Sequence, residues 1–246
     1  MIDWQAAALA AARANAAYVM KEADSASAFS SLGDTWIGMY ANNSHQAVLS
    51  ADARGETHLS ISGTRASAWK VMDVLADVSL APVAVDGGNV TGGVLEGMQG
   101  LWEWVLATIP AGDVVHVAGH SLGASRTHLT PLFLPAAQIG QLHSFEAPKF
   151  ADASFYAAHA DALGNMVCVL NGADLWAAWP WKDPRWQARP NVPHAWIKDD
   201  AGGYVMIPGP YWPGGVDADD HDMSRVQMRV QAIAAKVATG LTETTS

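Results

Sequence analysis

Gly119, Ser121 and Gly123 form a Gly-x-Ser-x-Gly pentapeptide. The apolar-rich run Val114–Ala118 before it predicts a β-strand, and the residues after it predict about two turns of helix before Pro131 interrupts them. In such a strand–turn–helix the serine sits exposed at the tip of a tight turn, and the glycines remove side chains that would collide across it. A chance match is the alternative, but the preceding strand favours the turn. We therefore predict that Ser121 is a catalytic nucleophile.

A serine hydroxyl is a poor nucleophile at neutral pH, so it needs a base to accept its proton and a carboxylate to orient that base. In α/β-hydrolase topology the acidic residue follows the serine and the histidine comes last. Asp174 is favoured because it follows the predicted strand Met166–Leu170 and a turn, and catalytic side chains gather at strand ends; a turn or helix-capping role is its alternative. Beyond Asp174 the sequence has only His194 and His221. We favour His221, which precedes the last predicted helix, and His194 remains the alternative.

An acyl-transfer site also needs hydrogen-bond donors for the oxyanion that forms on the substrate. The backbone amide of Leu122, the residue after the serine, is one donor by construction of the turn. A second donor is expected after an earlier strand, and Gly63-Thr64 at the end of the predicted strand 57–62 is the best candidate. Loss of one such donor typically costs about 10²–10³ in rate, so the placement of this loop matters.

Several motifs in this sequence resemble those of the class 3 lipases, the fungal triacylglycerol lipase type and its bacterial relatives. The serine motif of that family is Gly-His-Ser-Leu-Gly followed by Gly or Ala, and residues 119–124 read Gly-His-Ser-Leu-Gly-Ala. The oxyanion strand of the family ends in Gly-Thr or Gly-Ser before a short helix, as residues 61–64 do. Further similarities lie at residues 144–148, 171–176 and 221–224, in the same order as in the family.

The site residues that the resemblance implies are Ser121, Asp174 and His221 as a triad, with Thr64 and the Leu122 amide as the oxyanion hole. It also implies hydrolysis of carboxylic esters of the acylglycerol type through an acyl-enzyme, without a cofactor. The segment 65–78 corresponds to the lid of the family, which supports transient contact with a lipid interface as a hypothesis.

The chain departs from the family pattern near the serine. Ser62 stands where the family usually has arginine, and Glu146 stands where it has glycine. The helix after the serine carries Arg126 and His128, whereas that helix is small and apolar in the family. A buried arginine needs a partner, and Glu146 is a candidate for that role. We therefore expect a divergent member, whose substrate does not carry over from the family.

The elements that must position these residues follow from the periodicity of the chain. Further strands are predicted at 36–41, 46–50, 57–62, 142–145 and 166–170, and helices at 4–20, 67–78, 94–109 and 224–239. Helices that alternate with strands indicate a parallel sheet covered on its faces. We predict a single α/β-hydrolase domain over residues 1–246, with a mostly parallel central sheet flanked by helices.

The composition limits what the chain can do. Of its 246 residues 50% are apolar and 15% are charged, which excludes general disorder. The net charge of −10 argues against nucleic acid as a partner and against bulk electrostatic binding to an anionic membrane. The histidines lack metal-ligand spacing, so no metal is expected. No signal peptide or membrane span is evident, so a cytoplasmic location is the default expectation, with export by another route left open.

Residues 176–220 form an insertion-like region rich in tryptophan and proline. Its first part, 176–212, holds six of the eleven tryptophans and half of the prolines. These aromatic side chains either cover the backbone of the loops or form an apolar wall for an acyl chain. We predict a lipase-like serine carboxylic ester hydrolase that acts on a lipid or small-molecule ester. An esterase or acyltransferase for small soluble esters and a non-catalytic lipid-binding module are the alternatives, and no oligomeric state is predicted.

Overall fold

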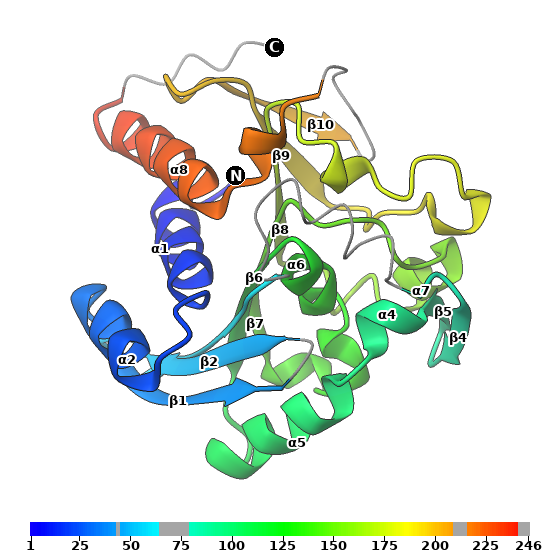
Figure 1. Ribbon diagram of the computed structural model, residues 1–246, viewed down its shortest axis with the longest axis horizontal. Helices are drawn as coiled ribbons and strands as arrows, with labels where there is room; N and C mark the ends of the chain where they lie inside the picture. Colours follow the sequence, from blue (N-terminus) through cyan, green and yellow to red (C-terminus); the bar gives the residue numbers. More distant parts are fainter. Residues whose placement is uncertain (43–44, 64–78, 209–215, 241–246) are drawn as a thin grey trace.

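The computed structural model describes residues 1–42, 45–63, 79–208 and 216–240, and its centre is an eight-stranded sheet (Figure 1). The strand order is β1-β2-β3-β6-β7-β8-β9-β10, in which the strands from β3 to β9 run parallel and β1, β2 and β10 extend the two edges antiparallel. These strands are Thr35–Ala41 (β1), Gln46–Ala51 (β2), Thr57–Ile61 (β3), Val115–His120 (β6), Ile139–Phe145 (β7), Met166–Asn171 (β8), Pro193–Ile197 (β9) and Tyr204–Pro208 (β10). The predicted α/β fold with a mostly parallel central sheet is confirmed.

Helices cover both faces of this sheet (Figure 1). One face carries α1 and α8, which lie side by side, and the other carries α4, α5 and α6. Two further helices, α2 and α7, and a separate hairpin of β4 and β5 complete the fold, and α7 and β5 add buried side chains to the core on the α5 face. The bounds are Trp4–Ala16 (α1), Glu22–Ser31 (α2), Gly92–Leu95 (α4), Met98–Thr108 (α5), Leu122–Thr127 (α6), Ala153–Ala158 (α7), Met223–Ala238 (α8), Pro82–Val85 (β4) and Gly88–Thr91 (β5).

Two hydrophobic cores lie on opposite faces of the sheet, and the alternation of side chains along β8 shows how they are separated. Val167 and Val169 pack into the core formed with α1 and α8, whereas Met166 and Cys168 pack into the core formed with α5. Successive side chains of a strand point to opposite faces, so a continuous apolar run fills both cores. The buried alanines of α1 are short, which lets this helix lie close against α8.

The boundaries of some elements differ from those predicted. The helix predicted over 4–20 ends at Ala16, and the helix predicted over 94–109 is divided into α4 and α5 at Gly97, whose φ is +72°. The structure adds α2, α7, the β4–β5 hairpin and β10, none of which the periodicity predicted. α2 buries only Ser25 and Phe29, so its sequence carries little amphipathic signal. The helix predicted over 67–78 falls outside the described residues.

Three consecutive parallel strands deliver polar residues to one edge of the sheet. Ser121 directly follows β6, Glu146 directly follows β7, and Asp174 follows β8 after a short turn. Parallel strands have their carboxyl ends at the same edge, so these side chains are brought together although they are far apart in the sequence.

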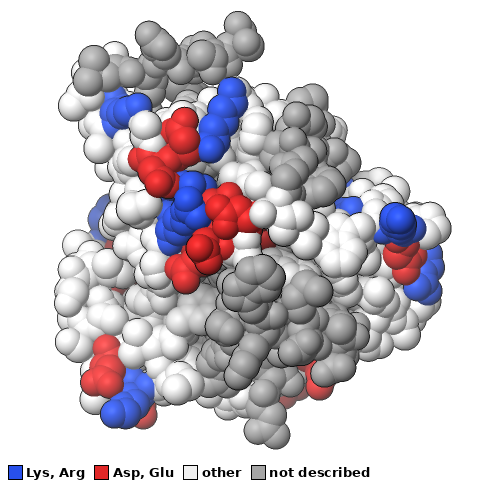
Figure 2. All heavy atoms as spheres, turned by 45° about the horizontal axis from the view of Figure 1, so that its top comes forward, with Lys and Arg blue, Asp and Glu red and all other residues white. Residues whose placement is uncertain are grey.

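The surface around α8 mixes both signs of charge. Figure 2, with the α8 end turned forward, shows basic and acidic side chains interleaved rather than separated into patches. The ion pairs of this face include Arg225 with Asp217 at 3.2 Å and Arg229 with Asp200 at 2.6 Å. Within the described residues, no helix is both long enough and apolar enough to span a bilayer.

Candidate active site

Ser121 occupies a sharp turn between β6 and α6. Its φ of +56° is rarely adopted by residues other than glycine and costs on the order of 1–3 kcal/mol, so it persists only where the surroundings fix it. The Ser121 amide is held by the Phe145 carbonyl at 2.9 Å. A Cβ on Gly119 would lie 2.2 Å from the Gly123 carbonyl oxygen, and one on Gly123 would lie 2.2 Å from the Ile61 carbonyl oxygen. The turn therefore requires glycine at both positions, as the pentapeptide predicted.

The hydroxyl of Ser121 is hydrogen-bonded to a histidine that is itself hydrogen-bonded to a carboxylate. His221 Nε2 lies 2.8 Å from Ser121 Oγ, and His221 Nδ1 lies 2.7 Å from Asp174 Oδ2. An ionised carboxylate can only accept, so Nδ1 carries the proton and Nε2 has a free lone pair. This arrangement allows the imidazole to accept the serine proton. The structure thus brings together the three residues proposed from the sequence.

Asp174 is 4% exposed and lies close to the groups that stabilise its charge. Burial alone would raise its pKa, but His221, the Glu146 carboxyl and the Trp176 amide together hold that pKa below its usual value. The Trp176 amide donates to Asp174 Oδ1 at 2.8 Å, and the indole of Trp176 packs edge-on to the His221 ring. Asp174 can therefore remain a carboxylate although it is buried.

The serine differs from the prediction in its accessibility. Ser121 was expected to be exposed, yet it is 2% exposed, and His221 is 3% exposed. Among the described residues, His221 Nε2 lies 2.8 Å from Ser121 Oγ, and the Trp176 ring lies beside the His221 ring.

Asp220 fixes the His221 loop to the Asp174 loop. The Asp220 carboxylate accepts the Ala173 amide at 2.8 Å through Oδ2 and the Arg229 guanidinium at 2.7 Å through Oδ1. The Asp220 carbonyl accepts the side-chain amide of Asn171 at 2.6 Å, and Arg229 also donates to Asn171 Oδ1 at 2.8 Å. Sequence reasoning did not single out Asp220 or Arg229. The only local signal was that Asp220 immediately precedes His221.

His194, the alternative base, lies elsewhere. It is fully buried in β9 beside Cys168 of β8, and its Nδ1 donates to the Val192 carbonyl at 2.8 Å. Burial lowers the pKa of His194 to about 4, so its ring is neutral at pH 7. The histidine at Ser121 is His221.

The oxyanion loop predicted at Gly63-Thr64 is placed beside the serine as far as Gly63. β3 pairs with β6 so that Ile61 is opposite Gly119, and a Cβ on Gly63 would lie 2.7 Å from Ser121 Cβ. Thr64 itself falls outside the described residues. Leu122 is the first residue of α6, and the first amides of a helix have no acceptor within the helix.

Tyr18 and His120 hold the Gly63 loop in place through hydrogen bonds. The Tyr18 hydroxyl accepts the Gly63 amide at 2.9 Å and lies 2.6 Å from His120 Nδ1. Because its oxygen accepts from Gly63, its proton is available for the His120 nitrogen. The His120 ring packs against the His221 ring with 4.9 Å between centroids. His120 points into the fold, as expected, and contacts both Tyr18, which holds Gly63, and the ring of His221.

Arg126 and Glu146 do not pair with each other, contrary to the partnership considered from the sequence. Arg126 is 1% exposed and donates instead to the backbone carbonyls of Gly93, Val94 and Glu96. Burial lowers the pKa of Arg126 to about 10. Glu146 is fully buried at the end of β7, where its carboxyl lies beside Asp174 and His221.

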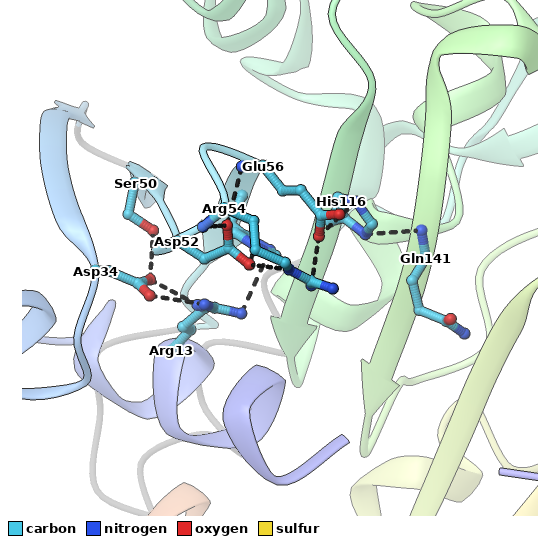
Figure 3. Close-up of polar contacts among 9 residues, drawn as sticks. Arg13, Asp34, Ser50, Asp52, Arg54, Glu56, His116 and Gln141 are labelled. Carbon is cyan, nitrogen blue, oxygen red and sulfur yellow. Dashed lines mark hydrogen bonds and ion pairs between the residues drawn. The ribbon is translucent and has the colours of Figure 1, made fainter. Parts of the chain in front are cut away.

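A second polar cluster surrounds a cavity of about 290 Å³ near the amino ends of β3, β6 and β7 (Figure 3). Ligand-type atoms of Asp52, Glu56 and His58 lie within 4.8 Å of one another, which raises the question of a metal site. His116 Nε2 is 3.8 Å from Glu56, and His58 Nε2 is 3.8 Å from Asp52. A cation would need lone pairs on these ring nitrogens.

The hydrogen bonds of His58 and His116 place the proton of each neutral ring on Nε2, the nitrogen that faces the carboxylates. Arg13 donates to His58 Nδ1 at 3.4 Å, and the Gln141 amide donates to His116 Nδ1 at 3.1 Å. Both rings are therefore protonated on Nε2, which faces the carboxylates. Arg54 already neutralises Glu56 at 2.6 Å. The ion pairs around this cavity are those of Arg54 with Asp52 and Glu56 and of Arg13 with Asp34.

Comparison with known proteins finds the same fold in solved structures of fungal lipases. No protein-family model and no curated protein matches the sequence, but solved structures of fungal lipases have the same fold. They include the triacylglyceride lipase of Rhizomucor miehei (TM-score 0.65, 15% identity, 88% of this chain and 92% of that chain). The lipase of Rhizopus microsporus var. chinensis (0.65, 14%, 89% and 85%) and the triacylglycerol lipase of Penicillium expansum (0.60, 14%, 85% and 86%) are similar to the same degree. The chain has the α/β-hydrolase fold of these fungal lipases.

Proposed function

We propose that this protein is a serine hydrolase that cleaves carboxylic esters through an acyl-enzyme on Ser121. The observation that carries the proposal is the continuous hydrogen-bonded chain from Ser121 Oγ through His221 to Asp174, with distances of 2.8 and 2.7 Å. Each bond has the donor and acceptor that proton transfer from the serine requires.

The chemistry follows from these contacts. Ser121 Oγ attacks the acyl carbonyl while His221 Nε2 takes the hydroxyl proton, and Asp174 stabilises the imidazolium that results. The Leu122 amide and the loop at Thr64 are the proposed donors to the oxyanion of the tetrahedral intermediate. His221 then returns the proton to the leaving alcohol. Water, activated by the same imidazole, hydrolyses the acyl-enzyme and restores Ser121.

We propose acyl esters of lipid type as the substrate class. The fold shared with triacylglycerol lipases supports this choice. The Trp176 indole beside His221 supports it further, because an apolar wall at the reacting centre favours an apolar acyl group.

The test is hydrolysis of p-nitrophenyl esters from acetate to palmitate by the wild type, Ser121→Ala and Ser154→Ala. Ser154 is an exposed serine of α7 and serves as the matched control. We expect Ser121→Ala to lose activity by about 10³-fold or more, whereas the control keeps it. Preference for the longer chains would support the lipid substrate class. Full activity in Ser121→Ala would refute the proposed nucleophile. A second test is covalent labelling of Ser121 by a fluorophosphonate probe. If the probe does not label Ser121, a non-catalytic binding module becomes the better interpretation.

A further inference from the structure

Glu146 has an unfavourable backbone conformation, and its carboxyl group lies beside Asp174 and His221. Its φ of +58° lies in the left-handed region that favours glycine, and the residue is fully buried. A long polar side chain persists in such a position only when the surrounding structure holds it there. The contacts of its carboxyl group therefore need an explanation.

Ordinary hydrogen bonds do not supply that explanation. Among the described residues, no side chain or backbone group donates to either Glu146 oxygen in good geometry; the Asn171 backbone amide lowers the pKa of this carboxyl only as the smallest of several effects. The carboxyl, Asp174 and His221 all approach within 4.8 Å of one another. Two carboxylates bind each other only when one of them is protonated, since an ionised carboxylate is an acceptor alone. A proton on Glu146 would provide the missing donor.

We propose that Glu146 is a positioning residue of the Ser121 site, which keeps its proton and donates it in a hydrogen bond to the Asp174 carboxylate. The inference rests on the proposed hydrolase function. Asp174 would then be fixed by three donors, namely Glu146, the Trp176 amide and His221 Nδ1. The Glu146 hydrogen bond withdraws part of the negative charge of Asp174, so the His221 imidazolium is stabilised less than it would be by an unbonded carboxylate.

The electrostatic surroundings agree with a protonated Glu146. Burial, followed by the charge of Asp174, raises the pKa of Glu146 well above its usual value. The other charged groups that face this carboxyl are Asp220, whose negative charge acts in the same sense, and Arg189, whose positive charge opposes it. His221 completes the group on the side of the serine. Two like charges in one buried site commonly share a single proton.

The first experiment compares Glu146→Gln with Glu146→Met by measuring kcat/KM against pH. Glutamine keeps a donor of the same length, whereas methionine fills a similar volume without one. We expect Glu146→Gln to stay within about threefold of the wild type, with its acid limb in place. Glu146→Met should lose about tenfold in kcat, and the acid limb of its pH profile should move about half a pH unit upward, because the Asp174 carboxylate then keeps its full negative charge.

The controls separate positioning from a structural role. Glu103→Gln, at an exposed position of α5, should leave both the rate and the pH profile unchanged. If glutamine and methionine shift the acid limb equally, or if neither shifts it, the hydrogen bond to Asp174 is refuted. Should Glu146→Met not fold, Glu146→Gly removes the same donor at a backbone position that favours glycine.

A second experiment needs no substrate and therefore separates this inference from the proposed activity. The usual pKa of a glutamate is 4.5, so in the unfolded chain Glu146 loses its proton above that pH, whereas the folded protein retains it. The stabilisation that this proton provides is complete below about pH 4.5 and is lost as pH rises toward the folded pKa. Glutamine has no such dependence. The folding equilibrium constant of Glu146→Gln relative to that of the wild type should therefore increase by up to about tenfold per pH unit as the pH rises above 4.5, until the folded pKa of Glu146 is reached. A difference independent of pH would show that Glu146 is ionised and would overturn the proposal, whether or not the protein hydrolyses esters.

Discussion

Gly172→Ala tests whether the loops carrying Asp174 and His221 are locked together by Asp220. Gly172 has a φ of +54° in the turn between β8 and Asp174. A Cβ at this position would lie 2.0 Å from Asp220 Oδ2. The carboxylate cannot move away freely, because it accepts the Ala173 amide at 2.8 Å and the Arg229 guanidinium at 2.7 Å.

The expected loss of stability is the sum of two costs. An L-residue in the left-handed conformation costs about 1–2 kcal/mol. Displacing Asp220 disrupts its pair with Arg229, and both side chains are nearly buried, at 6% and 5% exposure. Breaking a buried ion pair typically costs about 3–5 kcal/mol. Gly172→Ala should therefore cost about 4–7 kcal/mol of unfolding free energy.

Gly55→Ala is the matched control for this substitution. Gly55 has a φ of +81°, but nothing lies within 4 Å of a Cβ placed there. This variant should show only the backbone cost of about 1–2 kcal/mol. In a chain of this size the difference between the two variants corresponds to about 6–20 °C in Tm, which thermal unfolding followed by circular dichroism resolves.

Activity gives the second readout. Displacement of Asp220 moves the His221 loop, and a misplacement of about 1 Å can cost about 10²-fold in rate. We expect Gly172→Ala to lose kcat on this scale toward p-nitrophenyl esters and Gly55→Ala to retain it. Equal loss of stability in the two variants, or full kcat in Gly172→Ala, would refute the idea that Asp220 couples the loops.

Two further substitutions address the residues around the serine. Asp174→Asn should lower kcat by about 10⁴ with little change in KM, because an amide favours the tautomer of His221 that cannot accept the serine proton; steady-state kinetics measure the loss, and a loss confined to KM would contradict it. Tyr18→Phe removes the hydroxyl that accepts the Gly63 amide at 2.9 Å and lies 2.6 Å from His120. Removal of an oxyanion donor typically lowers the rate by about 10²–10³, and Tyr18→Phe should lower kcat by less than this because Tyr18 acts only through the Gly63 loop. An unchanged kcat in a folded variant would exclude that role.

The nucleophile turn could be predicted from the sequence because every requirement for it is local. A strand, two glycines and a helix lie within a short stretch, and the steric need for each glycine follows from the turn itself. Asp174 and His221 required one more step, namely the order in which α/β-hydrolases place these partners. The structure brings Asp174 to Ser121 because the carboxyl ends of β6 and β8 lie at one edge of the sheet, and it brings His221 there from the turn before α8, which Asp220 holds against the Asp174 loop.

Contacts that depend on side-chain direction could not be predicted in this way. Arginine and glutamate commonly carry opposite charges, and this suggested an ion pair between Arg126 and Glu146, both of which are buried. Arg126 instead extends toward the carbonyls at α4, and Glu146 extends toward Asp174. Opposite charge in a sequence gives no information about the direction in which two buried side chains point.

The helix pair α1 and α8 links the two sides of the proposed site. Arg229 of α8 holds Asp220 and thereby the His221 loop, whereas Tyr18, just beyond α1, holds the Gly63 loop. The two helices pack against each other and are joined by a hydrogen bond of 2.7 Å from Asn15 to Gln227. A shift of α8 would therefore disturb the contact of Arg229 with Asp220, and a shift of α1 would disturb the contact of Tyr18 with Gly63. The packing of α1 against α8 thus fixes the anchors of the two loops relative to each other.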